Sequence, residues 1–312
     1  MTPAPRPTGS TIWAAVLAAL CLSGPACADI AAITSQTAGA LTLIDTDTGA
    51  VLSTTPLPGH PAAVAIDAAR GRIMAVAVNT GLLHVFDIAG HAVAQHKVAG
   101  TPFGLAIRPE TGTALITDQR GFLREVDPDT GAELTVWTVG AMPSGVAAGP
   151  GLIVTADRDD NAMTVIRGDR VTRVQTGRHP FGVTLHDGLI FTADVLDDTI
   201  SVIGPGGAVQ HKIAVAERPY AVAFAAGQGF VTNQYDSSVT VFDAATYAVT
   251  ATIPVGDYPE GLAATADGRR IVVANWFSDT VSLIDTATLT VVAEVDVPAG
   301  PRAFGIFTAP DP

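Results

Sequence analysis

Short apolar runs alternate with polar turns along most of the chain, and the clearest unit of this pattern extends from Tyr258 to Asp285. An apolar run opens it at 258–263, a β-branched run fills 270–274, and apolar and polar residues alternate over 280–285. Each run has the length and the pattern of a β-strand. An Asp-Gly turn and a polar loop separate the runs, and a fourth strand is predicted at 289–297. The unit therefore predicts four short strands.

This unit recurs along the chain, marked by a phrase in which a proline is followed by a small residue and then an apolar one. The prolines are Pro61, Pro102, Pro143, Pro180, Pro219, Pro259 and Pro301. Their spacing of 37 to 42 residues is typical of the blades of a β-propeller. Three strands precede the first proline, at 30–34, 40–44 and 51–55, and one follows the last, at 302–308. We therefore predict an all-β fold, a seven-bladed β-propeller of four-stranded antiparallel blades, with the C-terminal strand completing the first blade.

The N-terminus has the features of a targeting segment. Arg6 is its only charge, residues 12–22 form an apolar run too short to span a bilayer, and Ala26, Cys27 and Ala28 form an A-x-A cleavage site. We predict a cleaved signal peptide over residues 1–28 and a single propeller domain over 29–312. The mature protein is then expected in the periplasm or outside the cell, with no membrane span.

The composition limits the partners and the chemistry. The formal net charge is -13 and no stripe of basic residues is present, which excludes a nucleic-acid partner. Both cysteines, Cys21 and Cys27, lie in the predicted signal peptide, so the mature chain has no disulfide, thiol nucleophile or cysteine metal ligand. The predicted outer strands, such as 132–139 and 248–255, carry no continuous apolar patch, and we expect a monomer.

A comparison of the repeats with one another separates scaffold from site. Positions that every repeat fills alike are expected to serve the blade. Two residues after each proline comes a small residue, which close packing of the inner strands explains: Ala63, Gly104, Gly145, Gly182, Ala221, Gly261 and Ala303. A polar residue ends the second strand of each blade and is expected to bond the following loop: Ser35, Asn79, Asp118, Asp157, Asp194, Asn233 and Asn275.

Positions that differ between repeats are candidates for ligand binding. The residues before the prolines vary most, and strand direction places them around one mouth of the central channel, here called the upper face. They are His60, Thr101, Met142, His179, Arg218, Tyr258 and Gly300. The rings of Phe103, Phe181, Tyr220, Tyr235, Trp276 and Phe277 are expected near the same rim. The candidate ligand-binding residues are therefore His60, Met142, His179, Arg218, Tyr258, Asp157, Asp194 and Trp276.

Catalytic and metal-binding signatures are missing from the sequence. The turns at 45–49 and 127–131 lack the spacing and the distal Glu of an EF-hand. No nucleophile elbow and no H-E-x-x-H motif occurs. His60 and His179 fall in blades two and five, nearly opposite each other in the ring, so a shared ion would need a bridging cofactor. No residue is therefore assigned a catalytic or metal-binding role.

Two segments carry a resemblance to a known family. FVTNQYDSSVTVFD, from Phe230, and VVANWFSDTVSLID, from Val272, resemble the repeat of the YVTN-family, YncE-like seven-bladed propellers. The resemblance extends over the mature chain and is closest in blades five to seven. It implies a periplasmic or cell-surface propeller, of a family whose roles are mostly unassigned, and it does not fix a function.

Three functional hypotheses follow. The first is an exported, non-enzymatic propeller that binds a partner protein or a small ligand on its upper face, with no cofactor required by the sequence. The second is an accessory protein of a periplasmic redox system that holds a haem-like or quinone cofactor over the channel, with His60 or His179 as ligand. The third is a metal-dependent lyase or lactonase, which would hold a divalent ion in the central mouth.

Overall fold

The computed structural model describes residues 1–2 and 29–310, which fold into seven four-stranded antiparallel sheets. The predicted signal peptide falls almost entirely outside these residues. Blade 1 contains β1 (Asp29–Ser35), β2 (Ala40–Asp45), β3 (Val51–Pro56) and β28 (Thr308–Pro310). Blade 2 contains β4 (Pro61–Asp67), β5 (Arg72–Ala77), β6 (Leu82–Asp87) and β7 (Ala92–Lys97), and blade 3 contains β8 (Pro102–Ile107), β9 (Ala114–Asp118), β10 (Phe122–Val126) and β11 (Glu133–Thr138). Blade 4 contains β12 (Pro143–Gly149), β13 (Leu152–Asp157), β14 (Ala162–Arg167) and β15 (Arg170–Gln175).

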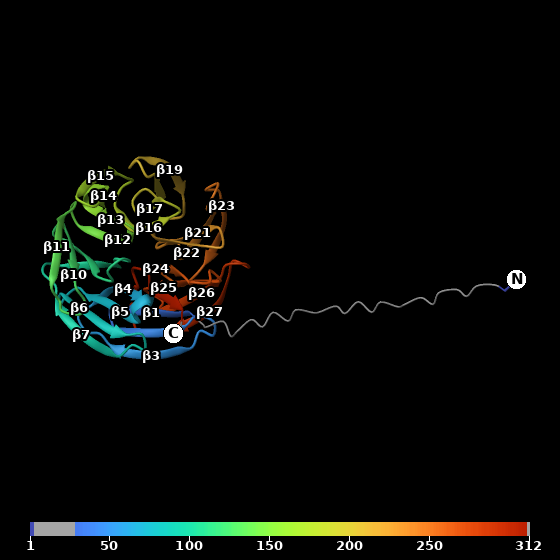
Figure 1. Ribbon diagram of the computed structural model, residues 1–312, viewed down its shortest axis with the longest axis horizontal. Helices are drawn as coiled ribbons and strands as arrows, with labels where there is room; N and C mark the ends of the chain where they lie inside the picture. Colours follow the sequence, from blue (N-terminus) through green and yellow to red (C-terminus); the bar gives the residue numbers. More distant parts are fainter. Residues whose placement is uncertain (3–28, 311–312) are drawn as a thin grey trace.

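Blade 5 contains β16 (Pro180–His186), β17 (Leu189–Asp194), β18 (Thr199–Ile203) and β19 (Val209–Ala214). Blade 6 contains β20 (Pro219–Ala225), β21 (Gln228–Asn233), β22 (Ser238–Asp243) and β23 (Val249–Pro254), and blade 7 contains β24 (Pro259–Ala264), β25 (Arg270–Asn275), β26 (Thr280–Asp285) and β27 (Thr290–Asp296). Two 3-10 turns, η1 (Ala68–Arg70) and η2 (Arg158–Asp160), complete the elements. Figure 1 shows the sheets arranged around a central axis, with the first and last elements of the fold side by side. The predicted seven-bladed propeller is confirmed.

The core lies between neighbouring blades. The second strand of a blade is covered on both faces, which explains its uninterrupted apolar runs, whereas the outermost strand, such as β27, buries alternate residues. Met163 of blade 4 and Ile190 of blade 5, for example, belong to one buried cluster. No helix among the described residues is long and apolar enough to cross a membrane.

The small residues near the axis are explained by close approach of the inner strands. A Cβ added at Gly104 would lie well inside 3.0 Å of the Ser144 carbonyl oxygen, and one at Gly182 equally close to that of Tyr220. Real Cβ atoms do not approach backbone oxygens so closely, so only a residue without a side chain fits there. The predicted packing role of these positions is confirmed.

The ring closes within blade 1, where β28 pairs antiparallel with β1. The prediction of a continuous strand at 302–308 is only partly right, since the regular pairing with β1 begins at Thr308. Before it, the chain turns away from blade 1 at Ala303 (φ 47°) and Gly305 (φ 122°). The carbonyl groups of Phe304 and Ile306 instead accept the N–H groups of β4, each at 2.9 Å. This last segment therefore joins blades 1 and 2 along the channel.

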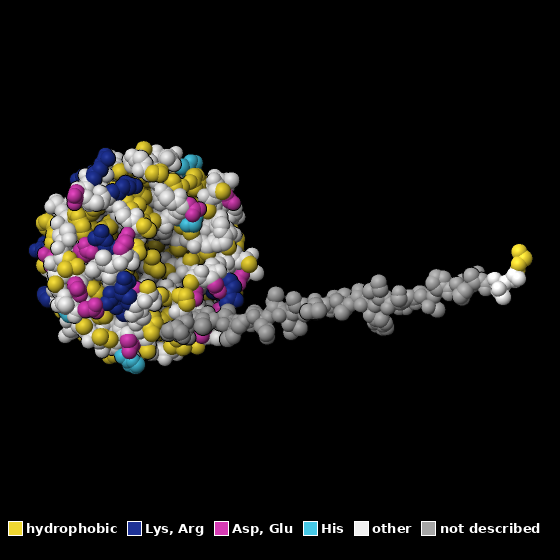
Figure 2. Space-filling model, viewed as in Figure 1, with side chains coloured by type: hydrophobic (Ala, Val, Ile, Leu, Met, Phe, Trp, Pro, Cys, Tyr) yellow, Lys and Arg dark blue, Asp and Glu magenta, His cyan; other side chains and the backbone are white. Residues whose placement is uncertain are grey.

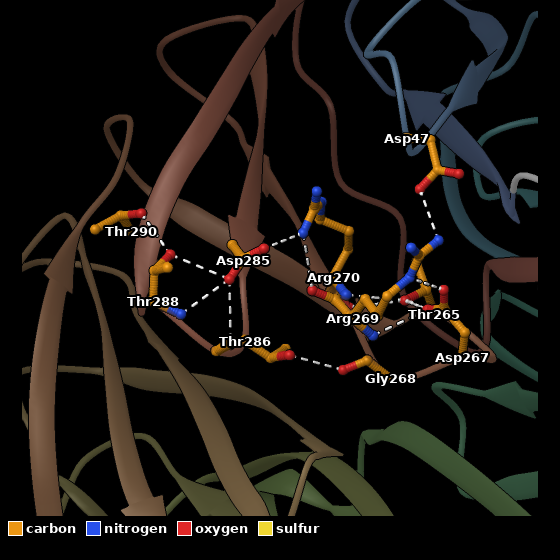
Figure 3. A network of polar contacts seen from close by, with 11 residues as sticks. Asp47, Thr265, Asp267, Gly268, Arg269, Arg270, Asp285, Thr286, Thr288 and Thr290 are labelled. Carbon is orange, nitrogen blue, oxygen red and sulfur yellow. Dashed lines mark hydrogen bonds and ion pairs between the residues drawn. The ribbon is translucent and has the colours of Figure 1, made fainter. Parts of the chain in front are cut away.

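Aspartates build turns on the rim opposite the upper face, here called the lower rim. Asp45 Oδ1 accepts the N–H groups of Asp47 and Thr48, at 2.9 and 2.8 Å. In the same way Asp285 Oδ1 accepts the N–H and the hydroxyl of Thr288 (Figure 3). Arg269 of blade 7 forms an ion pair with Asp47 of blade 1 at 3.3 Å. This ion pair links the first and last blades where the ring closes.

Candidate functional site

The upper rim is made by the same hydrogen bond in every blade. The carbonyl of the residue before each inner-strand proline accepts the N–H of the residue that follows the second strand. The acceptors are His60, Thr101, Met142, His179, Arg218, Tyr258 and Gly300. The loop that enters the innermost strand and the loop that follows the second strand therefore lie on the same face of each blade.

Most of these rim residues have an unusual backbone conformation. The φ angles of His60, Met142, His179, Arg218 and Tyr258 lie between 49° and 60°, in the left-handed region that favours glycine. A residue other than glycine in this backbone conformation destabilises the fold by on the order of 1 kcal/mol. The repeated carbonyl bond fixes the turn that imposes the conformation, so the rim is a rigid platform for side chains that differ from blade to blade.

Two of the predicted site residues are used inside the blades. Asp157 is fully buried and accepts the hydroxyl protons of Thr155 and Thr164, at 2.8 and 2.5 Å. Asp194 is fully buried and accepts those of Thr199 and Ser201, at 3.1 and 2.6 Å. Burial raises the pKa of Asp157, and raises that of Asp194 to about 6. Both carboxyl groups serve the scaffold, as predicted, but they bind hydroxyl groups of strands in their own blade and not the following loop.

Four rings of blades 6 and 7 form a continuous aromatic surface, here called the aromatic cluster. It contains the predicted site residues Tyr258 and Trp276, together with Tyr235 and Phe277, which were expected near the same rim. The Tyr258 and Phe277 ring centroids are 4.4 Å apart, and those of Trp276 and Phe277 are 4.9 Å apart. Tyr235 is 5.5 Å from Tyr258 and carries the Arg218 guanidinium 5.3 Å above its ring. Tyr235 and Phe277 are 55% and 64% exposed. Such a group of contacting, exposed rings is typical of an interaction site.

A shallow groove of about 340 Å³ runs beside the aromatic cluster, and its walls include Glu217, Gln234 and Asp257. Glu217 and Asp257 are accessible to solvent, so the groove combines aromatic surface with negative charge. Burial, followed by the neighbouring Tyr235, raises the pKa of Tyr258 to about 12. The Tyr258 phenol therefore stays neutral at physiological pH and can donate or accept a hydrogen bond.

A buried polar network supports the aromatic cluster from below. Glu260 of β24 is 1% exposed and binds Arg302 Nε at 2.6 Å, while Gln234 Nε2 donates to its other oxygen at 2.7 Å. Burial raises the pKa of Glu260, and Arg302 opposes this shift. The Arg302 guanidinium also lies 5.0 Å from the Trp276 ring. The network thus connects the closing segment of the chain to blades 6 and 7 under the site.

Four rings fill the channel just below the rim, here called the aromatic plug: Phe103, Phe181, Tyr220 and Phe304. Phe181 contacts all the others, with ring centroids 5.8 Å from Phe103, 4.1 Å from Tyr220 and 5.3 Å from Phe304. Burial raises the pKa of the Tyr220 phenol well above its usual range. The first three rings were predicted near the rim, and they lie just below it, with Phe103 and Phe181 in the wall of the channel.

The remaining predicted residues are spread around the rim. His60 is exposed on blade 2, and Met142 and His179 are half-buried on blades 4 and 5. Burial, together with the charge of Arg158, lowers the pKa of His179, so its imidazole is neutral at physiological pH. Among the described residues, no group of three or more His, Asp or Glu is placed to hold a metal ion. Of the eight candidates, the structure brings Arg218, Tyr258 and Trp276 together.

The comparison of the repeats did not identify four residues of the site: Gln234, Glu260, Arg302 and Phe304. Glu260 and Arg302 each follow an inner-strand proline, the position that holds Phe103, Phe181 and Tyr220 in other blades. This position varies as much between repeats as the one before it. The acid and the base at equivalent positions of adjacent blades were a signal that could have predicted their pairing.

The fold and the site together define a class: the chain is a seven-bladed β-propeller with an aromatic surface on its upper rim. The family model described as YNCE-like beta-propeller matches residues 207–301, which span β19 to β27. The predicted resemblance to the YncE-like propellers is therefore confirmed, with the match lying over the last strand of blade 5 and over blades 6 and 7. No curated protein matches the sequence.

Several solved structures are similar in fold. A functionally unknown protein from Desulfotomaculum acetoxidans has a TM-score of 0.76 and 13% identity, over 89% of this chain and 99% of that one. The dihydro-heme d1 dehydrogenase NirN has a TM-score of 0.66 and 14% identity, over 88% of this chain and 64% of that one. Virginiamycin B lyase from Staphylococcus aureus has a TM-score of 0.68 and 16% identity, over 80% and 92%. At such identities the likeness shows the fold alone.

Proposed function

We propose that this protein is an exported binding protein whose aromatic cluster holds a segment of a partner protein. The observation that carries the proposal is the set of four contacting rings, two of them more than half exposed, on a rim with a fixed backbone. Exposed aromatic side chains on a rigid support supply most of the binding energy at protein interfaces, because little conformational entropy is lost when a partner covers them.

The charge beside the rings suggests the kind of segment that fits. Glu217 and Asp257 border the groove, and the whole chain carries a net charge of -13. An extended segment with a basic side chain next to an aromatic or apolar one would place its charge against the carboxylates and its apolar group on Phe277. The groove is shallow and open, which favours a peptide segment over a small molecule that needs enclosure.

A peptide library displayed on phage tests this proposal. Peptides selected on the wild-type protein should lose affinity for Tyr235→Ala and Phe277→Ala, by about 30-fold for each ring if each contributes about 2 kcal/mol. Both side chains are exposed, so the variants should fold. Val93→Ala on the outer strand β7 is the matched control, since Val93 is 67% exposed and far from the rim loops in the blade. The proposed surface would be refuted if the selected peptides bound the wild type, the two ring variants and the Val93→Ala control with equal affinity.

Export is part of the proposal, supported by the apolar run and the A-x-A site at the N-terminus. The intact mass of the protein purified from its source cells should correspond to a chain that begins at Asp29. A mass that includes residues 1–28 would contradict cleavage.

The redox and lyase hypotheses remain alternatives, because proteins named as a haem d1 dehydrogenase and as a lyase share the fold. The neutral imidazole of His179 is the form that ligates a metal, although His60 stands on a different blade. A visible absorption band in the protein purified from its source would favour the redox role, and a stoichiometric divalent metal would favour the lyase role. Either result would displace peptide binding as the main function.

A further inference from the structure

The axis of the propeller contains a second cavity, separate from the upper rim. Its volume is about 600 Å³, and its walls are the inner strands, the turn η1 with Asp67 and Arg70, and residues 303–306. Figure 2 shows a hollow on the axis of the ring with hydrophobic side chains in it. Cavities of this size hold small molecules in many proteins.

The aromatic plug closes the upper end of this cavity. Phe103, Phe181 and Phe304 belong both to the plug and to the cavity wall, with ring centroids within 6.1 Å of one another. At the other end the wall includes Ile306, which is 71% exposed. The cavity is therefore entered from the lower rim, and its occupancy does not depend on the proposed function of the upper face.

The hydroxyl groups in the wall are already bound to neighbouring blades. Ser144 donates to the Phe181 carbonyl at 3.1 Å, and Thr184 donates to that of Val222 at 2.6 Å. Thr308 donates to the Ala264 carbonyl at 2.6 Å. Each of these hydroxyl groups donates its proton to the backbone. The rest of the lining is mainly apolar, apart from Asp67 and Arg70, which form an ion pair at 3.3 Å.

Several half-buried side chains of the cavity wall are small or flat, and Ile107 and Leu185 add larger apolar groups. Ala106, Ala147 and Ala148 leave the space open on blades 3 and 4. On blades 5 and 6, His186 stacks on Phe224 with ring centroids 3.9 Å apart and planes 1° from parallel. A flat, apolar molecule can therefore contact a broad surface without displacing a bound polar group.

The cavity also offers a few polar points. The inner strands β8, β12, β16, β20 and β24 each form the inner edge of their sheet, so their outward backbone groups border the axis. An apolar pocket with a small number of backbone donors and acceptors is typical of a small-molecule site. We propose that the channel binds an uncharged, mainly apolar small molecule of drug-like size, which enters from the lower rim.

Nile red, an uncharged apolar dye whose fluorescence rises in apolar surroundings, is a suitable probe. The wild-type protein should bind one dye molecule, with a gain in fluorescence and a rise in melting temperature. Ile306→Trp should weaken binding by at least about tenfold because a larger side chain would fill the entrance. The wild-type Ile306 side chain is exposed and its carbonyl still bonds β4, so this variant should fold.

Two further variants make the result specific. Ala148→Leu fills the cavity from another wall and should also weaken binding, whereas Phe277→Ala on the upper rim should leave the affinity unchanged. The proposal is overturned if the wild-type protein binds no dye, if Ile306→Trp binds it as well as the wild type, or if Phe277→Ala abolishes binding. Loss in Phe277→Ala alone would place the dye on the aromatic cluster and leave the peptide proposal standing.

Discussion

Replacing Asp194 by Asn should change how the stability of the propeller depends on pH. Asp194 is fully buried at the end of β17, and burial raises its pKa from 3.8 to about 6, against the lowering effect of Ser201 and Lys212. The folded state thus holds this proton more tightly than the unfolded chain does. The stabilisation that comes from binding this proton is complete below about pH 4 and is lost as the pH rises through about 6. Raising the pKa of Asp194 from 3.8 to about 6 corresponds to about 3 kcal/mol of stability.

The chain itself shows that Asn can occupy this position. Asn275, at the end of β25, donates to Thr280 and Ser282 at 3.1 and 2.8 Å, in the pattern that Asp194 shares with Thr199 and Ser201. The amide introduced by Asp194→Asn would keep these bonds without a charge. The free energy of unfolding of this variant, relative to wild type, should therefore rise by about 3 kcal/mol between pH 4 and pH 7.

Urea unfolding followed by tryptophan fluorescence at pH 4, 5, 6 and 7 measures this difference. Asp118→Asn is the control, because Asp118 holds the same place in blade 3 but binds Arg120 and Arg124. Although burial raises the pKa of Asp118, these bonds and the Thr101 N–H lower it to about 2. The stabilisation that comes from the Asp118 carboxylate is complete above about pH 4 and is lost as the pH falls through about 2.

The two variants should therefore behave differently over the same pH range. Asp118→Asn should be less stable than wild type by about 2 kcal/mol at every pH from 4 to 7, a value reduced because Arg120 is half-exposed and its charge is screened. Asp194→Asn should diverge from wild type only as the pH rises. Parallel curves for Asp194→Asn and wild type would refute the reasoning.

Three other predictions concern the ring. Gly182→Ala should lower the free energy of unfolding by several kcal/mol in urea, because the added Cβ would meet a backbone oxygen. Gly206→Ala has open space around the added Cβ and should lower it by less than about 0.5 kcal/mol. Equal losses in the two variants would contradict the packing argument. Arg302→Met leaves the buried Glu260 without its ion-pair partner and should lower the free energy of unfolding by about 3–5 kcal/mol in the same assay. Adding Glu260→Gln should recover most of this loss. A loss that the second substitution does not change would be contrary evidence. Deletion of residues 302–312 removes β28 and the segment bound to β4, and should lower the melting temperature by more than about 10 °C; an unchanged value would defeat the closure argument.

Most of the architecture could be predicted from the sequence because the repeat forces it. Seven prolines at a period near 40 give the number of blades, and three strands before the first with one after the last give the closure. The path of residues 303–307 could not be predicted in this way. It depends on a change of backbone direction at Gly305, and on pairing with a strand of another blade, which local pattern does not encode.

The candidate site was harder to predict because it depends on distances between blades. Strand alternation placed Tyr258 and Trp276 on the upper rim, where the structure has them in contact. It could not show that Asp194 is enclosed by hydroxyl groups, or that Phe181 lies below the rim. These outcomes depend on side-chain packing across the axis, which a repeat alignment within one chain does not contain.

The pairing of β28 with β1 also has a consequence for the time course of folding. The strand that begins the fold at Asp29 lacks its innermost neighbour until the chain has been synthesised to Pro310. Blades 2 to 7 are each made from consecutive strands and can assemble while synthesis proceeds, but the first sheet is incomplete until β28 has been made. The ring can therefore close only after the strands of the other six blades have been synthesised.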